Sequence, residues 1–404
     1  SPRSAMLLVA YLGVTQVLVL SYTFRHIYFV LFAALGTWPA WEPCLWDPDV
    51  IVFPSHTGQL KRVSGPVLRW GWGITCLALG AFTLAPLELN DSPALLAAGG
   101  LLNLALLFGL FQNDKDGLSA HRVAQLAVLG LALATTLHTD HRLRTKTGLP
   151  VPNQLATWAI FLAGPHMCLF SSTTPLKRYI AMWASLASCY CLLCVNYELL
   201  FFGVLGLALL EWLVLERAIF HAHAQPSAVP PPSQSKAGAH LQETDQILGM
   251  SDVRTAFTFL LMVHIAFFGT GNIASMSSFQ LSATYRFVTL FSPFLMATLC
   301  IVAKLIPYML VTAHVLLLAS ERRAAGHSKV PPFKLFLLVV AIYDLLAVSL
   351  FFSVRDSGSW LDIGNSISQF GLANAQCVFL PLLFGVALHF VRGVKLDAAT
   401  PHTD

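Results

Sequence analysis

Charged side chains are scarce in this chain. Asp, Glu, Lys and Arg together make up 11% of its 404 residues, whereas 56% of the residues are hydrophobic. A soluble domain carries about 25% charged residues, and it needs them to cover its surface. The composition therefore excludes a soluble enzyme and a disordered chain, and it favours a protein that lies in a membrane.

A strong net charge and a disulfide framework are also lacking. The 24 basic and 20 acidic residues give a net charge of +4, spread thinly, which is unlike the basic patch of a nucleic-acid-binding protein. Seven of the eight cysteines lie inside apolar runs, where thiols pack as small hydrophobic groups. Cys189, Cys191 and Cys194 have no nearby His or carboxylate before Glu198, so we expect packing there and no metal. We predict no nucleic-acid partner.

The sequence contains no established motif for hydrolysis or phosphoryl transfer. It has no Ser-His-Asp order, no H-E-x-x-H, no phosphate-binding Gly-rich loop with Lys and no paired metal carboxylates. Chemistry on a phosphodiester needs a placed nucleophile or metal ion, and no stretch is both polar and long enough to fold such a site. We therefore assign no catalytic, cofactor-binding or metal-binding residue.

Long apolar runs dominate the rest of the sequence. They lie at 5–24, 27–41, 67–86, 94–111, 123–138, 154–170, 179–195, 197–214, 255–270, 287–319, 335–354 and 370–391. In lipid, a spanning segment must pair its own backbone groups, which a helix of about 20 residues does. The sequence predicts an all-α fold, a polytopic transmembrane helical bundle of about 12 or 13 membrane-spanning helices.

One run is too long for a single upright crossing. At about 1.5 Å per residue, 287–319 would reach well beyond a hydrocarbon core of about 30 Å. Ser292-Pro293 and Ile306-Pro307 offer breaks, so we expect either a tight pair of helices or a half-helix followed by a long tilted helix.

A count of Lys and Arg over a 13-crossing arrangement gives 13 on the side of the N-terminus and 11 on the other. This difference leaves the orientation open under the positive-inside rule.

A Pro-rich segment divides the chain into two blocks. Residues 221–252 hold Pro230-Pro231-Pro232 among Ser, Gln, Lys and Gly, a composition typical of a flexible, solvated loop. We expect an N-terminal block of about eight transmembrane helices at 1–220 and a C-terminal block of four or five at 253–404. The first run is expected to span and not to be a signal peptide. Because the chain starts at a serine, we interpret it as a fragment.

Two charged residues interrupt the apolar runs. Asp344 lies in the middle of 335–354, where an acid costs about 2.5–3.5 kcal/mol on insertion. We expect it to face a partner, a water cavity or a neutralising proton. Lys304, between Ala303 and Leu305, is a possible partner. A lipid-headgroup or proton site and a structural hydrogen bond to another helix both stay open for Asp344.

Two polar stretches interrupt the C-terminal block. In the first, 267–275 (FFGTGNIAS), the glycines allow the backbone to approach another segment closely or to change direction. The second, 355–368, combines Arg355, Asp356 and Asp362 with hydroxyl groups and a tryptophan. This mixture suits a zwitterionic or phosphate-bearing headgroup. The alternative is an ordinary capped loop, in which Asp362 or Ser366 starts a helix.

These stretches resemble the C-terminal membrane region of the PIG-N family of GPI ethanolamine phosphate transferases. The matching segments are FFGTGNIAS at 267–275, FSPFLMATLCIVAKLIPYMLV at 291–311 and SGSWLDIGNSIS at 357–368, in the same order and spacing. A weaker likeness extends through LPVPNQLATWA at 149–159 and SYTFRHIYFVLFAALGTWPAW at 21–41. The resemblance thus covers nearly the whole chain.

The resemblance implies an activity and a set of partners. That family transfers ethanolamine phosphate from phosphatidylethanolamine to the first mannose of GPI-anchor precursors, in the endoplasmic reticulum membrane. Its luminal catalytic domain, which holds two divalent metal ions (zinc expected), precedes this region, and no position here matches its catalytic motifs. The implied partners are that domain and the two lipids. Candidate lipid-headgroup contacts are Arg355, Asp356, Asp362, Asp344 and Lys304.

Two rival functions stay open on the sequence. A transporter or flippase for lipids or small solutes would use Asp344, Lys304 and the interrupted run near Pro293. The sequence has no internal repeat of fixed period, which speaks against this class. The other rival is a membrane scaffold without chemistry.

Overall fold

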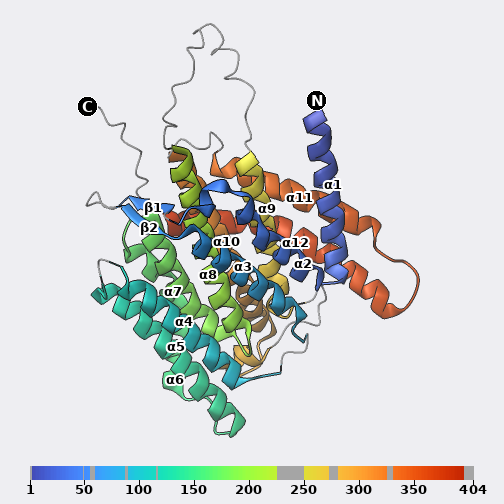
Figure 1. The fold of residues 1–404 in the computed structure, drawn as a ribbon. Helices are drawn as coiled ribbons and strands as arrows, with labels where there is room; N and C mark the ends of the chain where they lie inside the picture. The colour runs from blue at the N-terminus through green and yellow to red at the C-terminus, as the bar shows by residue number, and fades with distance from the viewer. Residues whose placement is uncertain are drawn as a thin grey trace.

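Twelve α-helices form one bundle in the part of the chain that the computed structural model describes (Figure 1). The described residues are 2–48, 50–54, 60–86, 90–114, 117–224, 250–272, 281–324 and 331–394. Eight of these helices are long and apolar enough to cross a membrane. The predicted all-α, polytopic membrane bundle is therefore confirmed. About 12 or 13 spanning helices were expected, and eight of the twelve described helices have the length and composition to span.

Eight of the described α-helices precede residue 225, and all but one of their connections are short; the long one is 38–64. They are α1 (Pro2–Thr23), α2 (Ile27–Thr37), α3 (Gly65–Ala81), α4 (Pro93–Gln112), α5 (Ala120–Arg144), α6 (Val151–Ala163), α7 (Pro175–Leu193) and α8 (Glu198–Ala224). Short 3-10 helices extend or link them: η1 (Trp38–Trp41), η2 (Pro43–Trp46), η3 (Phe82–Leu84) and η4 (Gly164–Phe170). Several helices begin with Pro in the first turn, where the missing N–H has no helical partner to lose.

Four longer helices complete the bundle. They are α9 (Met250–Phe268), α10 (Pro293–Ala324), α11 (Pro332–Phe352) and α12 (Trp360–Val391), with the short η6 (Ser282–Arg286) before α10. The predicted flexible loop 221–252 falls mostly on 225–249, which lies outside the described residues. At its borders the chain is helical, since α8 continues to Ala224 and α9 starts at Met250.

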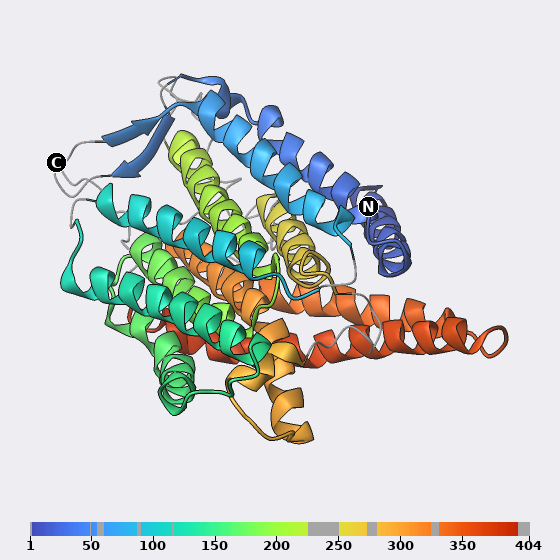
Figure 2. The ribbon, with the colours of Figure 1, turned by 90° about the horizontal axis from the view of Figure 1, so that it is seen from below.

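One β-hairpin interrupts the helices. β1 (Val50–Pro54) pairs antiparallel with β2 (Leu60–Val63), so that Val50 lies opposite Val63. The hairpin lies next to α8 at the edge of the bundle (Figure 2). The sequence analysis predicted no strand here, because the two strands are short and lie between two apolar runs.

The long run at 287–319 is helical only from Pro293 onward, so the break offered at Ser292-Pro293 is confirmed, whereas the break offered at Ile306-Pro307 was wrong. Pro293 begins α10 in the first turn, and Pro307 lies inside the helix without ending it. At 32 residues α10 is about 48 Å long. Internal Pro is tolerated in membrane helices because neighbouring helices repair the backbone, and Pro307 is itself buried among them.

Helices α7 and α8 form the centre of the bundle. Every residue of α7 from Arg178 to Leu193 is buried, and α8 packs against α3, α4, α7 and α10. A helix that is buried on all sides belongs in a core. The outer helices instead expose large apolar side chains, such as Phe294 and Phe352, as a lipid-facing surface requires. Helices α11 and α12 lie side by side and project from the rest of the bundle (Figure 2).

Hydrogen bonds join the helix termini at one end of the bundle, which we call the Arg25 end. Here α1, α3, α5, α7, α9 and α11 finish and the even-numbered helices begin (Figure 1). The Arg25 side chain donates to the carbonyl of Ala85, which joins the α1–α2 turn to the end of η3. The Ser92 N–H donates to the Val195 carbonyl at 3.0 Å, which joins the start of α4 to the α7–α8 turn.

Ion pairs join the helix termini at the opposite end, which we call the Glu216 end. Arg254 on α9 reaches Glu216 of α8 at 2.8 Å and Glu42 at 2.6 Å. Arg322 near the end of α10 pairs with Asp252 at the start of α9 at 3.1 Å. Because all five side chains are buried or half-buried, these pairs hold α8, α9 and α10 in register.

The two ends are about one hydrocarbon core apart. Glu198 and Glu216 lie 18 residues apart on α8, about 27 Å along its axis. Lys304 and Arg322 have the same spacing on α10. A bilayer core is about 30 Å thick. The two named charges on each of these helices are therefore separated by about the thickness of one hydrocarbon core.

Candidate functional site

Lys304 is part of a polar cluster at the Arg25 end. Its ammonium group on α10 donates to the side-chain oxygen of Asn272, which follows the last turn of α9. Glu198 at the start of α8 attracts the same ammonium group. Glu198 also accepts the backbone N–H of Val195 at 2.9 Å. Lys304 is thus satisfied within the bundle, and its suggested partner Asp344 is not the one it contacts.

The Gly-containing stretch before Asn272 is tightly packed. A Cβ atom at Gly269 would lie 2.3 Å from the Phe201 ring and 2.7 Å from the Ile265 carbonyl oxygen. Gly271 has a φ of +73°, which turns the chain out of α9. The expected close approach of the backbone is therefore confirmed. Asn272 then donates to the Phe267 carbonyl at 3.0 Å, which fixes its oxygen toward Lys304.

Arg286 is a second buried cation at this end, and sequence analysis missed it. Its guanidinium is 2% exposed and forms a fork with Asp140 of α5, at 2.9 and 2.8 Å. It also donates to the carbonyls of Leu192 at 2.9 Å and Cys194 at 2.7 Å. One side chain thereby joins η6, α5 and the end of α7. In the sequence, Arg286 is a single basic residue between two apolar runs. That pattern does not indicate which residue it would contact.

Asp344 lies on an exposed face of α11, about 12 Å from the end of that helix. Its neighbour is the half-buried thiol of Cys377 on α12, with which its carboxylate interacts. The described residues place no cation beside it. The structure therefore brings Asp344 together with neither Lys304 nor the stretch 355–368.

The stretch 355–368 forms the turn between α11 and α12 and leaves its charges exposed. Arg355, Asp356 and Asp362 are all exposed, and Trp360 is 90% exposed. The helix cap is Ser359, which accepts the Asp362 N–H at 3.2 Å and donates to the Asp362 carboxylate at 2.7 Å.

The suggestion that Asp362 or Ser366 caps α12 was therefore wrong, because Ser359 occupies that position and Asp362 completes the cap three residues on. Ser366 lies in the second turn and accepts the backbone N–H of Arg355 at 3.0 Å. This bond folds the start of the turn back onto α12. The side chains of Arg355 and Asp356 are exposed, and neither forms an ion pair among the described residues.

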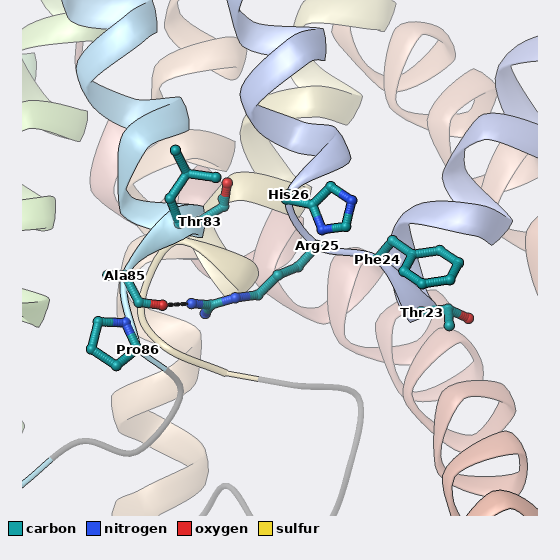
Figure 3. A pocket seen from close by; sticks show the side chains of 8 residues that line it. Thr23, Phe24, Arg25, His26, Thr83, Ala85 and Pro86 are labelled. Atoms are coloured by element: carbon teal, nitrogen blue, oxygen red, sulfur yellow. Dashed lines mark hydrogen bonds between the residues drawn. The ribbon is translucent and has the colours of Figure 1, made fainter.

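A cavity of about 600 Å³ opens at the Arg25 end (Figure 3). Its lining comes from two turns that lie far apart in the sequence: Thr23, Phe24, Arg25 and His26 from the α1–α2 turn, and Thr83, Leu84, Ala85 and Pro86 from the end of η3. In Figure 3 the Arg25 side chain crosses from the first turn to the Ala85 carbonyl of the second. We call this cavity the Arg25 pocket.

The Arg25 guanidinium is only partly satisfied. One terminal nitrogen donates to Ala85, while the other is enclosed and has no hydrogen-bond partner among the described residues. Burial lowers the pKa of Arg25, and the nearby Tyr197 hydroxyl works in the opposite direction. No acidic residue lines the pocket. The arrangement places a positive charge beside a cavity whose lining is otherwise half apolar.

Comparison with known protein families decides the classification. The family model "Phosphatidylinositolglycan class N (PIG-N)" matches residues 2–359.

This chain belongs to the PIG-N family.

Curated PIG-N relatives cover the same region. The chain is 33% identical over 404 residues to the protein of Mus musculus named GPI ethanolamine phosphate transferase 1, which covers 96% of this chain and 40% of the mouse protein. The human protein of that name is 32% identical over 385 residues, covering 92% and 38%. The Aspergillus oryzae protein is 30% identical over 425 residues, covering 96% and 40%. The chain thus spans about 40% of the length of these relatives. No solved structure matches it.

The described residues do not fit the metal pair that the PIG-N family implies. They contain no group of three or more His, Cys, Asp or Glu side chains that could hold a metal ion. Cys189, Cys191 and Cys194 are buried, free thiols in the core and contact no carboxylate-rich site. No chemical step at a metal is therefore assigned to these residues.

Proposed function

We propose that this chain forms the membrane region of a GPI ethanolamine phosphate transferase of the endoplasmic reticulum membrane. The reaction is the transfer of ethanolamine phosphate from phosphatidylethanolamine to the first mannose of a GPI-anchor precursor. The observation that carries this proposal is the PIG-N match over residues 2–359, together with relatives named for that activity.

The task of the membrane region follows from the physical nature of the two lipids. Both substrates have acyl chains, and moving one out of the bilayer costs about 0.8 kcal/mol per CH₂ group. The headgroups must therefore be presented at the interface while the chains stay in lipid. The Arg25 end supports this role, since it carries Arg25, Arg355, Asp356 and Asp362 at helix termini. We propose that a luminal catalytic domain with two divalent metal ions, zinc expected, acts at this end.

The α11–α12 turn is the proposed headgroup contact of this region. Arg355 can fork onto a phosphate, and Asp356 and Asp362 can accept an ammonium group. Their exposure supports the proposal, because no internal partner has to be displaced. Tryptophan favours the membrane interface, so the exposed Trp360 supports a position of the turn at headgroup depth. Lys304, which is bonded to Asn272, serves to hold α9 and α10 in place.

Variants that remove a charge from the α11–α12 turn test whether its residues contact a lipid headgroup or only stabilise the start of α12. Arg355→Gln and Asp362→Asn should each lower ethanolamine-phosphate transfer at matched protein levels. Asn at 362 keeps a side-chain oxygen that can accept the Ser359 hydroxyl, and the Ser359 cap itself is untouched, so Asp362→Asn should leave the unfolding temperature unchanged. Ser359→Ala is the matched control: it should lower stability by about 1 kcal/mol and keep transfer per folded molecule. Wild-type transfer in both charge variants would show that the turn is structural.

A chimera tests the proposed function as a whole. The matching region of the mouse relative is replaced by this chain, and the chimera is expressed in cells that lack the endogenous enzyme. We expect ethanolamine phosphate on the first mannose of GPI precursors, measured by mass spectrometry. A chimera carrying the human region serves as the positive control. A chimera that reaches the membrane in normal amounts without transfer activity would contradict the proposal and favour a transporter or a scaffold.

A further inference from the structure

The Arg25 pocket has the size and chemistry of a site for one charged group with an apolar attachment. Its volume of about 600 Å³ is within the usual range for small-ligand sites, roughly 300–1,000 Å³. Four of its lining residues are polar or charged (Thr23, Arg25, His26 and Thr83), and four are apolar (Phe24, Leu84, Ala85 and Pro86). The occupant should therefore have a polar part and an apolar part.

The charge of the pocket selects an anion. Arg25 is the only residue of its lining that always carries a charge, and no carboxylate of the described residues forms an ion pair with it. Its partners are the Ala85 carbonyl and the Tyr197 hydroxyl, which are neutral. Two neutral partners leave the guanidinium charge uncompensated, and an anionic oxygen in the pocket would balance it. A planar guanidinium matches phosphate oxygens better than any other side chain does.

The apolar half of the pocket identifies the source of that anion. Phe24 is 50% exposed and Leu84 is 56% exposed, although both are large apolar side chains beside a cation. Free phosphate offers nothing for these surfaces to contact. The glycerol backbone and first methylenes of a phospholipid would cover them while the phosphate reaches Arg25. The turn that carries Arg25 joins α1 to α2. Turns between apolar helices lie near the level of the lipid headgroups in a membrane.

We infer that the Arg25 pocket binds the phosphodiester group of a glycerophospholipid, with Arg25 as the anion-binding residue and Phe24 and Leu84 as contacts for the glycerol and upper acyl region. This inference rests on the proposed function, in which phosphatidylethanolamine is a substrate. It assigns the phosphate of that lipid to the Arg25 pocket, which leaves the α11–α12 turn to contact the headgroup of the other lipid, the GPI precursor. The chemistry requires no covalent step, only binding.

Direct lipid binding to the purified full chain in detergent tests the inference. The probes are phosphatidylethanolamine, diacylglycerol of the same chain length, and inorganic phosphate, and binding is measured by native mass spectrometry. We expect phosphatidylethanolamine to bind and diacylglycerol, which lacks the phosphate, to bind at least tenfold more weakly. Inorganic phosphate should also bind at least tenfold more weakly than the lipid. Equal affinity for inorganic phosphate and the lipid would overturn the assignment to a lipid.

Two variants and a control locate the binding site. Arg25→Gln should weaken phosphatidylethanolamine binding at least tenfold. Arg144→Gln is the matched control, because Arg144 also donates to a backbone carbonyl at this end, that of Asp91 at 2.9 Å, but does not line the pocket. It should bind lipid as the wild type does. Leu84→Trp fills the pocket from its exposed wall and should abolish binding even if Arg25→Gln fails to fold.

Wild-type lipid affinity in folded Arg25→Gln, or in Leu84→Trp, would overturn the inference. Because binding is measured without any transfer reaction, this outcome is distinct from failure of the proposed function, which the chimera tests. A folded wild-type chain that binds phosphatidylethanolamine and diacylglycerol equally well would likewise place the site elsewhere.

Discussion

At the scale of single residues, buried cations hold chain segments together that lie far apart in the sequence. Arg286 bridges η6 to Asp140, 146 residues earlier, and to two carbonyls at the end of α7. Its side chain is 2% exposed, so each of these bonds forms away from water. A charge buried with its full set of partners is tolerated, but removing one partner leaves the other uncompensated.

Arg286→Met should therefore destabilise the protein by about 3–5 kcal/mol. Arg286→Lys should rescue little of this, because an ammonium group cannot make the fork with Asp140. The measurement is the unfolding transition of the purified protein in detergent. Lys146→Met, a change of an exposed cation at the same end, should shift the free energy of unfolding by less than about 0.5 kcal/mol. If the two Met variants changed the free energy of unfolding equally, the hydrogen bonds of Arg286 would not stabilise the fold more than an exposed cation does.

Asp344→Asn is expected to affect activity more than abundance. The side chain is exposed on α11 and contacts the Cys377 thiol, so Asn can replace it without opening a cavity. If the carboxylate meets a lipid or a proton, ethanolamine-phosphate transfer by the mouse chimera should fall several-fold while the amount of protein holds. The comparison is transfer per molecule, with protein quantified by immunoblotting. A drop in abundance with unchanged transfer per molecule would instead make Asp344 a structural hydrogen-bond acceptor.

At the scale of helices, close contacts depend on small residues at the crossings with α8. A Cβ atom at Gly206 would lie 2.2 Å from the ring of Trp183 on α7, and one at Gly99 of α4 would lie 2.6 Å from the Leu200 nitrogen. Membrane helices approach closely where small residues meet, because packing replaces the hydrophobic effect that lipid cannot supply. Glycine at these positions thus sets the distance between α8 and its neighbours.

Gly206→Ala should destabilise the bundle by about 1–3 kcal/mol through overpacking against Trp183. Gly371→Ala on α12 is the matched control, because no atom lies within 4 Å of its Cβ position. That change should be neutral or stabilising by up to about 1 kcal/mol, since Ala favours a helix. The two variants are compared by their unfolding midpoints in the same detergent. A Gly206 variant as stable as the Gly371 variant would contradict the packing account.

The sequence predicts the helices much better than it predicts their partners. Apolar runs of spanning length indicate the all-α bundle directly, and the glycines of 267–275 indicate the close approach that Gly269 makes to Phe201. Hydropathy does not say which polar groups meet. Lys304 contacts Asn272, not Asp344, and Arg286 contacts Asp140, because these pairs form only after helices distant in sequence have packed.

The Arg25 pocket could not be located from the sequence for the same reason. Its two walls are separated by about 60 residues, and each wall alone is an ordinary short turn between apolar helices. The α11–α12 turn was easier, because its charges are contiguous in the sequence at 355–362. Even there, the residue that caps α12 was misassigned, since Ser359 and Asp362 are both good capping residues.

At the scale of the whole molecule, the distribution of basic residues predicts the orientation in the membrane. The structure describes 20 of the 24 Lys and Arg residues, and the Arg25 end holds seven of these 20: Arg25, Arg142, Arg144, Lys146, Arg286, Lys304 and Arg355. Assigning Lys and Arg to the two sides of a 13-crossing arrangement gives nearly equal numbers and predicts no orientation. The twelve helices that the structure describes assign the same residues differently, with fewer of them at the Arg25 end. Cytoplasmic segments are enriched in Lys and Arg, so we predict that the Arg25 end faces the lumen.

A luminal Arg25 end is the central claim, because the pocket, the α11–α12 turn and the proposed catalytic domain must all meet on one side. The most direct measurement is N-glycosylation mapping, since the acceptor sequence is modified only in the lumen. A spaced acceptor tag is inserted into 145–150, between α5 and α6, or into 171–174, between η4 and α7. We predict an endoglycosidase-sensitive mass increase for the tag at 145–150 and none for the tag at 171–174. Glycosylation at 171–174 with none at 145–150 would place the Arg25 end in the cytoplasm and contradict the account.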